Sequence, residues 1–170
     1  MLPVALAVSL SLGASTGDYN AVRQHGNNAG LSVLGAWGLS SAIAGAVGLA
    51  VADGPERKGM HAANLAWGVV NVGFAVVGLF LGSRPGATRP DRAGALADGV
   101  STQELYAVNA AFDVGYLALA ALSWLHFEDG RLKGFAKGSM LQALALFAFD
   151  ATMGLFHQLN NERVRQSERP

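Results

Sequence analysis

The stretch HAANLAWGVVNVGFAVVGLFLGS, residues 61–83, decides the fold of this chain. It is mostly apolar and contains no Asp, Glu, Lys or Arg. An α-helix rises about 1.5 Å per residue, so about 20 apolar residues cross the hydrocarbon core of a bilayer. The stretch therefore predicts a membrane-spanning helix.

Three other segments of similar length are also mostly apolar, at residues 30–52, 104–127 and 138–157. Polar, helix-breaking connections separate the four segments: the short DGPERKG and EDGRLKG, and the longer RPGATRPDRAGALADGVST between the second and third. We expect this middle connection to be irregular and exposed, because it is rich in Pro, Gly and Arg. The pattern predicts an all-α, up-down-up-down four-helix bundle that is integral to a membrane.

The composition agrees with a membrane protein and excludes other classes. Only 14% of the residues are charged, whereas about 25% is usual in soluble domains. Lys plus Arg equals Asp plus Glu, at 12 each, so no charge excess points to nucleic acid as a partner. Cysteine is absent, which excludes disulfides and thiol chemistry.

The chain divides into four regions along its length. Residues 1–15, MLPVALAVSLSLGAS, are apolar but too short to span a bilayer. They resemble the apolar part of a secretory signal, with small residues at Gly13 and Ser15 for cleavage, but lack its basic start. An uncleaved terminal helix is the alternative. A polar lead-in follows at 16–29, then the membrane domain at 30–158 and a solvated polar tail at 159–170.

Two sequence cues disagree on the orientation in the membrane. We call side A the side that holds residues 15–28, the middle connection and the tail, and side B the side that holds the two tight connections. A secretory signal predicts side A outside, which is the orientation we expect. Side A nevertheless carries seven Lys or Arg residues and side B five, and this count favours side A inside.

Polar residues recur every three or four positions on three of the four spans. These stripes are His61, Asn64 and Asn71; Tyr106, Asn109, Asp113 and Tyr116; and Gln142, Asp150 and His157. Residues at this spacing share one face of a helix. Because lipid cannot satisfy polar groups, we expect the stripes to face the interior of the bundle.

Counting along the helices places several of these groups at overlapping depths in the side-A half of the membrane. The predicted site consists of the charged pair Asp113 and Asp150, with His157 at the mouth and with Asn109, Asn71, Trp37 and Tyr116 as neighbours. No Lys or Arg lies within any span. The two acids therefore share a proton, bind a cation, or are held by neutral hydrogen-bond donors. We expect a pocket for a proton, a cation or a small polar ligand that opens to side A.

A structural role is the alternative to a binding site. Polar residues in membrane bundles often only tie helices together. The chain would then be a structural or accessory subunit of a larger membrane complex, or part of a homo-oligomer. The small residues Gly38, Ser41, Gly45 and Gly48 form a stripe on the first span, which we expect to pack within the bundle itself.

Four histidines suggest one further interpretation. His25 and His157 belong to side A, and His61 and His126 to side B, so each pair has the placement needed for the axial ligands of a b-type haem. Only the histidine pairing supports haem, and no other cofactor is predicted. The sequence lacks G-x-S-x-G, H-E-x-x-H and phosphate-loop motifs, which favours a protein that is not an enzyme.

The motifs also resemble an uncharacterised bacterial family of small four-helix membrane proteins, classed as a domain of unknown function. The matching pieces are LGAWGLSSAIAGAVG, HAANLAWGVVNVGF, VNAAFDVGYLALA and LKGFAKGSMLQALALFAFD, within residues 30–157. The second glycine of the family's Gly-Phe-Gly motif is replaced here, in GFAKG. The resemblance implies a bacterial membrane bundle and points to the same Asn and Asp positions, but it carries no activity.

Overall fold

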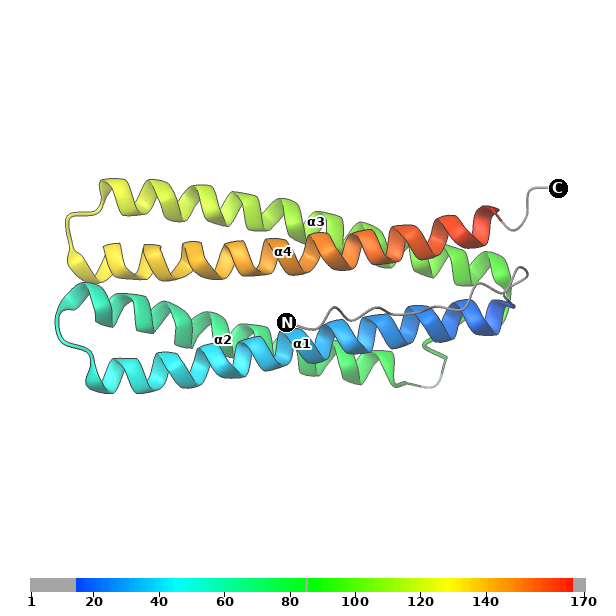
Figure 1. Cartoon of the computed structure of the whole chain (residues 1–170), viewed down its shortest axis with the longest axis horizontal. Helices are drawn as coiled ribbons and strands as arrows, with labels where there is room; N and C mark the ends of the chain where they lie inside the picture. Colours follow the sequence, from blue (N-terminus) through cyan, green and yellow to red (C-terminus); the bar gives the residue numbers. More distant parts are fainter. Residues whose placement is uncertain (1–14, 85, 167–170) are drawn as a thin grey trace, which may run out of the picture.

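A computed structural model describes residues 15–84 and 86–166, and these form four α-helices. They are α1 (Thr16–Val51), α2 (Pro55–Gly82), α3 (Arg92–His126) and α4 (Gly130–Gln166). The helices run up and down in turn, with the α1–α2 and α3–α4 connections at side B and the α2–α3 connection at side A (Figure 1). The prediction of an all-α four-helix bundle is confirmed. The signal-like segment lies outside the described residues, apart from Ser15.

Local sequence explains where the helices begin. At α1, the Ser15 hydroxyl accepts a hydrogen bond from the Asp18 amide while the Asp18 carboxylate accepts one from the Ser15 amide, forming a capping box. At α2, Gly54 has a φ of +84°, which favours glycine, and Pro55 occupies the first turn, where its missing N–H costs nothing. At α3, Asp91 accepts the amide of Gly94 at 2.7 Å. The starts of α1, α2 and α3 therefore follow from local sequence.

The helices extend beyond the predicted spans at side A. The middle connection was expected to be irregular through residue 102, but α3 already begins at Arg92. The tail was expected to be solvated, but α4 continues to Gln166. Both expectations were wrong because these extensions have a core of their own, in which Tyr19, Ala95 and Val164 are buried against one another. The polar lead-in is helical for the same reason.

Each helix is long and apolar enough to cross a membrane. In the most apolar stretch of each helix, only 17–28% of the residues are buried inside the bundle. The remaining apolar side chains, such as Phe74, Phe80 and Phe112 at 60–64% exposed, point outward. A water-soluble bundle buries an apolar stripe and exposes a polar face, so this outward apolar surface indicates contact with lipid.

Small residues set the distance between α1 and α2. The stripe of Gly38, Ser41, Gly45 and Gly48 is buried, as the packing interpretation expected. A Cβ atom added to Gly38 would lie 2.8 Å from the carbonyl oxygen of Gly68 on α2, and one added to Gly68 would lie 2.6 Å from the Gly38 carbonyl oxygen. Only glycine at both positions permits this approach of the two backbones.

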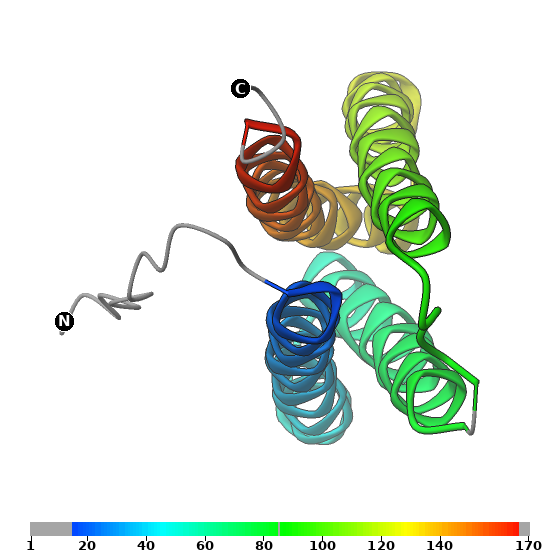
Figure 2. The ribbon, with the colours of Figure 1, turned by 90° about the vertical axis from the view of Figure 1, so that its right-hand side faces the viewer.

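The bundle consists of two hairpins, α1–α2 and α3–α4, which meet mainly where α2 packs on α4. At side B this contact is close, because a Cβ added to Gly138 would lie 2.8 Å from the carbonyl oxygen of Met60. Among the described residues, the backbones of α2 and α3 are not in contact, although side chains of the two helices meet at Trp67 and Tyr116, and Figure 2 shows the two helices apart in the view from side A. The interior is therefore divided between α3–α4 contacts and α1–α2–α4 contacts.

Candidate intramembrane polar site

Asp113 of α3 and Asp150 of α4 turn towards each other inside the bundle. They are 5% and 6% exposed, and their side chains are within hydrogen-bonding distance of each other. Asn109, one turn from Asp113, lies close enough to Asp150 to interact with its carboxyl group. The expected meeting of the two acids in a lipid-free interior is thus present in the geometry.

The pair has a chemical consequence. Two carboxylates cannot hydrogen-bond to each other without a proton, because ionised carboxylates only accept. A proton or a cation shared between the two acids would therefore favour their close approach. The second oxygen of Asp113, Oδ2, is buried and has no partner among the described residues. The pair therefore keeps one unused acceptor.

Trp37 contacts a different polar group from the one expected. Its indole Nε1 donates to Oε1 of Gln142 on α4 at 2.9 Å. The Gln142 amide nitrogen in turn donates to Ser41 Oγ at 3.2 Å and to Asn64 Oδ1 at 3.1 Å. Gln142 is 1% exposed, so one side chain ties α1, α2 and α4 together in the interior. The sequence signal for it was its place on the Asp150 stripe, two turns away.

Asn71 also lies apart from the acids. It is 1% exposed and packs against Gly38 of α1, and its amide nitrogen has no hydrogen-bond partner among the described residues. Its depth was counted correctly, but its helix turns it towards α1. Asn109 is therefore the only predicted amide that reaches the aspartates.

Tyr116 lies one turn beyond Asp113 but faces another way. It is 47% exposed, and its ring packs edge-on against Trp67 of α2 at 5.4 Å between centroids. Trp67 donates to Ser139 at 3.2 Å. These three residues line an apolar cavity of about 340 Å³ between α2, α3 and α4, which contains neither aspartate.

His157 was expected at the mouth of the pocket, but it is fully buried at 0% exposed. Its ring stacks on Tyr106 of α3 at 5.5 Å, with 11° between the ring planes, and Phe156 packs against it edge-on. The expectation failed because α4 continues past His157 and the lead-in helix covers it. Tyr106 is also close enough to act electrostatically on Asp150, so it lies between His157 and the acid pair.

The other histidines do not share the environment of His157. His25 and His126 are exposed, and the His126 ring bonds the Leu122 carbonyl oxygen at 2.8 Å. His61 packs against Gly48 of α1. An exposed His25 and a buried His157 do not face a common slot, so the geometry gives the haem interpretation no support.

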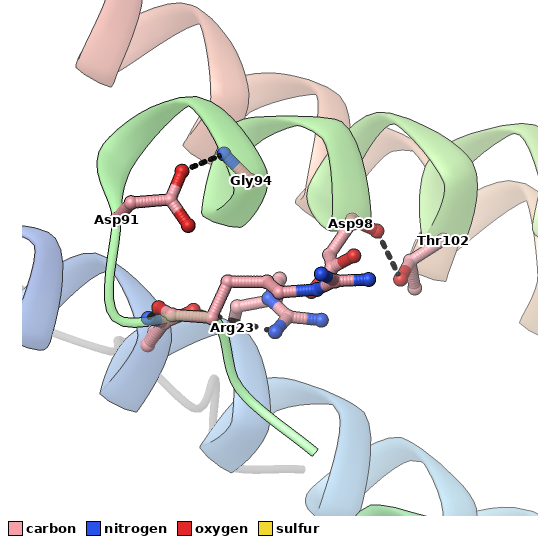
Figure 3. Close-up of polar contacts among 7 residues, drawn as sticks. Arg23, Asp91, Gly94, Asp98 and Thr102 are labelled. Atoms are coloured by element: carbon pink, nitrogen blue, oxygen red, sulfur yellow. Dashed lines mark hydrogen bonds and ion pairs between the residues drawn. The ribbon is translucent and has the colours of Figure 1, made fainter. Parts of the chain in front are cut away.

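The side-A end of the bundle contains a polar layer that the sequence interpretation missed. Tyr19 donates to Asn161 at 2.6 Å, Asn161 donates to Gln103 at 3.1 Å, and Tyr106 donates to Asn27 at 2.8 Å. Burial raises the pKa of Tyr19. Figure 3 shows Arg23 of α1 reaching towards the first turns of α3, beyond the cap between Asp91 and Gly94. This layer was missed because Tyr19, Asn27 and Asn161 were assigned to the lead-in and the tail, whereas Tyr106 was placed on the stripe of the third span.

Comparison with known proteins identifies the family. A model of a family of unknown function, DUF6992, matches residues 33–151, which is most of the chain. The chain belongs to the DUF6992 family. The match covers Asp113 and Asp150 but ends before His157 and before the side-A layer of α4. No curated protein and no solved structure matches this DUF6992 member, so no activity is transferred to it.

Proposed function

We propose that this multi-pass membrane protein binds a proton or a cation at Asp113 and Asp150 and acts as a binding or sensing module in a bacterial cell membrane. The single observation that carries the proposal is the direct contact of two buried carboxyl groups. No Lys or Arg occurs within the apolar spans to neutralise them. Intramembrane acids are functional candidates because isolated charges are costly there.

The pair favours a proton or a small monovalent cation over a multiply coordinated metal. Divalent cations take six or more oxygen ligands or at least three protein side chains. Among residues 15–84 and 86–166, no group of three or more His, Asp or Glu side chains gathers to hold a metal. Two carboxyl groups and the Asn109 amide suit a single shared proton, which a cation replaces when the pH rises.

Thermal unfolding of the purified protein in detergent tests this function. With both acids ionised, two negative charges lie in contact in an apolar interior, so the unfolding midpoint should fall as the pH is raised from 5 to 9. Sodium or potassium should restore the midpoint at high pH. Tyr106 on α3 and His157, whose ring stacks on Tyr106, are the nearby titratable groups to account for.

The informative variant is the double substitution Asp113→Asn and Asp150→Asn. Two amides keep a hydrogen bond but have no proton to lose, so the response to pH and cations should disappear. Asp53→Asn, at an exposed position outside the spans, is the matched control and should behave as the parent. If the unfolding midpoint of the double variant responds to pH and cations as that of the parent does, the proposal is wrong.

The Gln142 network favours a second candidate, a structural or accessory subunit of a larger membrane complex or homo-oligomer. Its three hydrogen bonds are all internal and need no ligand. The exposed apolar faces of the helices would then contact another membrane protein as well as lipid. In that case the double aspartate variant should unfold as the parent does at every pH, while co-purification with a membrane partner should depend on the outward helix faces.

A further inference from the structure

A second set of buried polar groups lies at the side-A end, away from the aspartates. His157 is 0% exposed, and neither of its ring nitrogens has a partner among the described residues. Asn160 is 8% exposed, and its amide nitrogen is likewise unpaired. The Arg23 Nε is buried without a partner, although its Nη2 donates to Asn20 at 3.3 Å.

The packing register of α1 against α4 brings these three side chains to one level. Three successive contacts set this register: Gly30 with Met153, Gly26 with Phe156, and Tyr19 with Asn161. Arg23 lies between the second and third contacts and so is level with the turn from His157 to Asn160. Consistent with this, Arg23 is close enough to act electrostatically on His157.

At this level the unpaired donors outnumber the unpaired acceptors. An arginine Nε and an asparagine amide nitrogen only donate, whereas a neutral histidine offers one N–H donor and one acceptor nitrogen. Leaving a buried donor unpaired destabilises the folded protein. The nearby acceptors are already engaged, because Asn20 accepts from Arg23 itself and Asn27 accepts from Tyr106 at 2.8 Å. The acid at this end, Asp98, pairs with Arg89 at 3.8 Å.

We propose that Arg23, His157 and Asn160 form a binding site for a small carboxylate anion at the side-A end of the bundle. A carboxylate supplies two acceptor oxygens, and a guanidinium edge with a free Nε–H matches its planar geometry. The positive charge of Arg23 compensates the negative charge of the ligand. The site is separate from the aspartate pair and does not depend on the function proposed for that pair.

Thermal unfolding of the full chain in detergent, with sodium acetate as the probe, tests the site. Acetate should raise the unfolding midpoint saturably, and sodium chloride at the same ionic strength should not. Arg23→Gln should weaken the apparent acetate affinity about tenfold to a hundredfold, the range of a charge-assisted hydrogen bond. Arg163→Gln, at an exposed arginine on α4, is the matched control and should leave the affinity unchanged.

Three outcomes would overturn the proposal. The first is that acetate does not specifically raise the unfolding midpoint of the parent, which leaves ordered water as the occupant. The second is that acetate raises the midpoint of the Arg23→Gln variant equally. The third is that inorganic phosphate raises the midpoint and acetate does not. The Asp113→Asn and Asp150→Asn double variant should keep its acetate response. Failure of this site and failure of the aspartate site are therefore distinguishable.

A second variant keeps the test decisive if Arg23→Gln does not fold. Asn160→Asp places a carboxylate of the chain itself beside Arg23 and His157. This internal acceptor should occupy the site and abolish the acetate response in a folded protein. Asn160→Ala, which removes one donor but leaves Arg23, should keep a weakened response. An Asn160→Asp variant that responds to acetate as the parent does would contradict the proposal.

Discussion

Replacing Gln142 by Leu should destabilise the bundle without changing its membrane insertion. Gln142 is 1% exposed and makes three interhelical hydrogen bonds, to Trp37, Ser41 and Asn64. Leucine has a similar volume, so the main effect is the loss of these bonds. Interhelical hydrogen bonds in membrane proteins average about 0.6 kcal/mol and reach about 1.7, so the three together are worth about 2 kcal/mol, with an upper limit of about 5.

Unfolding by SDS in mixed micelles, followed by far-UV circular dichroism, measures this difference. Gln158→Leu is the control, because Gln158 lies on the same helix but is exposed and bonds only Glu162, at 2.9 Å. It should change the free energy of unfolding by less than about 0.5 kcal/mol. Adding Trp37→Phe to Gln142→Leu should cost less than the two single changes together, since both remove one shared bond.

One result would refute this reasoning. If Gln142→Leu and Gln158→Leu unfold at the same SDS fraction, the network contributes nothing to stability. The tie between α1, α2 and α4 would then come from glycine packing alone. A stabilised Gln142→Leu variant would indicate that the free-energy cost of burying the amide exceeds the stabilisation from its three hydrogen bonds.

Two further predictions concern helix packing and surface charge. Gly68→Val should prevent α1 from docking on α2, because the new Cβ would lie 2.6 Å from the Gly38 carbonyl oxygen. Gly73→Val, at a position where a Cβ would meet no atom within 4 Å, should fold normally. Detergent gel filtration compares the two variants, and equal yields of folded protein would contradict the close-packing argument. The hydrogen bond from Lys137 lowers the pKa of the Glu56 carboxyl, so its stabilising effect is present above the ordinary glutamate pKa and is lost as the pH falls through the lowered value. Lys137→Met should remove this small acid-dependent loss of thermal stability, and an unchanged pH profile would show that the exposed pair contributes nothing.

The divided interior has a consequence for how the aspartate pair is held. Asp113 and Asp150 belong to the same hairpin, so their contact needs no rearrangement between α1–α2 and α3–α4. Gln142 instead joins α4 to the other hairpin. A change at the acids should therefore alter α3–α4 packing first, while a change at Gln142 should loosen one hairpin from the other.

The sequence by itself determined the four spans, their alternating direction and the meeting of Asp113 with Asp150. Span length and apolarity are local properties of the sequence, and the thickness of the bilayer core sets the length that they require. Each acid lies on the polar stripe of its helix, and polar groups are unfavourable on the surface that faces lipid. Counting residues from the side-A ends of the predicted spans, at residues 104 and 157, also places the two acids at similar depths.

Only the tertiary structure decided which polar groups share a pocket. Counting gives the depth of a residue along a helix but not the direction in which the packed helix turns it. Trp37 and Asn71 have suitable depths yet belong to the α1–α2–α4 contacts, and Tyr116 faces the cavity beside Trp67. Burial of His157 likewise depends on helix extensions whose apolar core, around Tyr19 and Val164, comes from residues far apart in the chain.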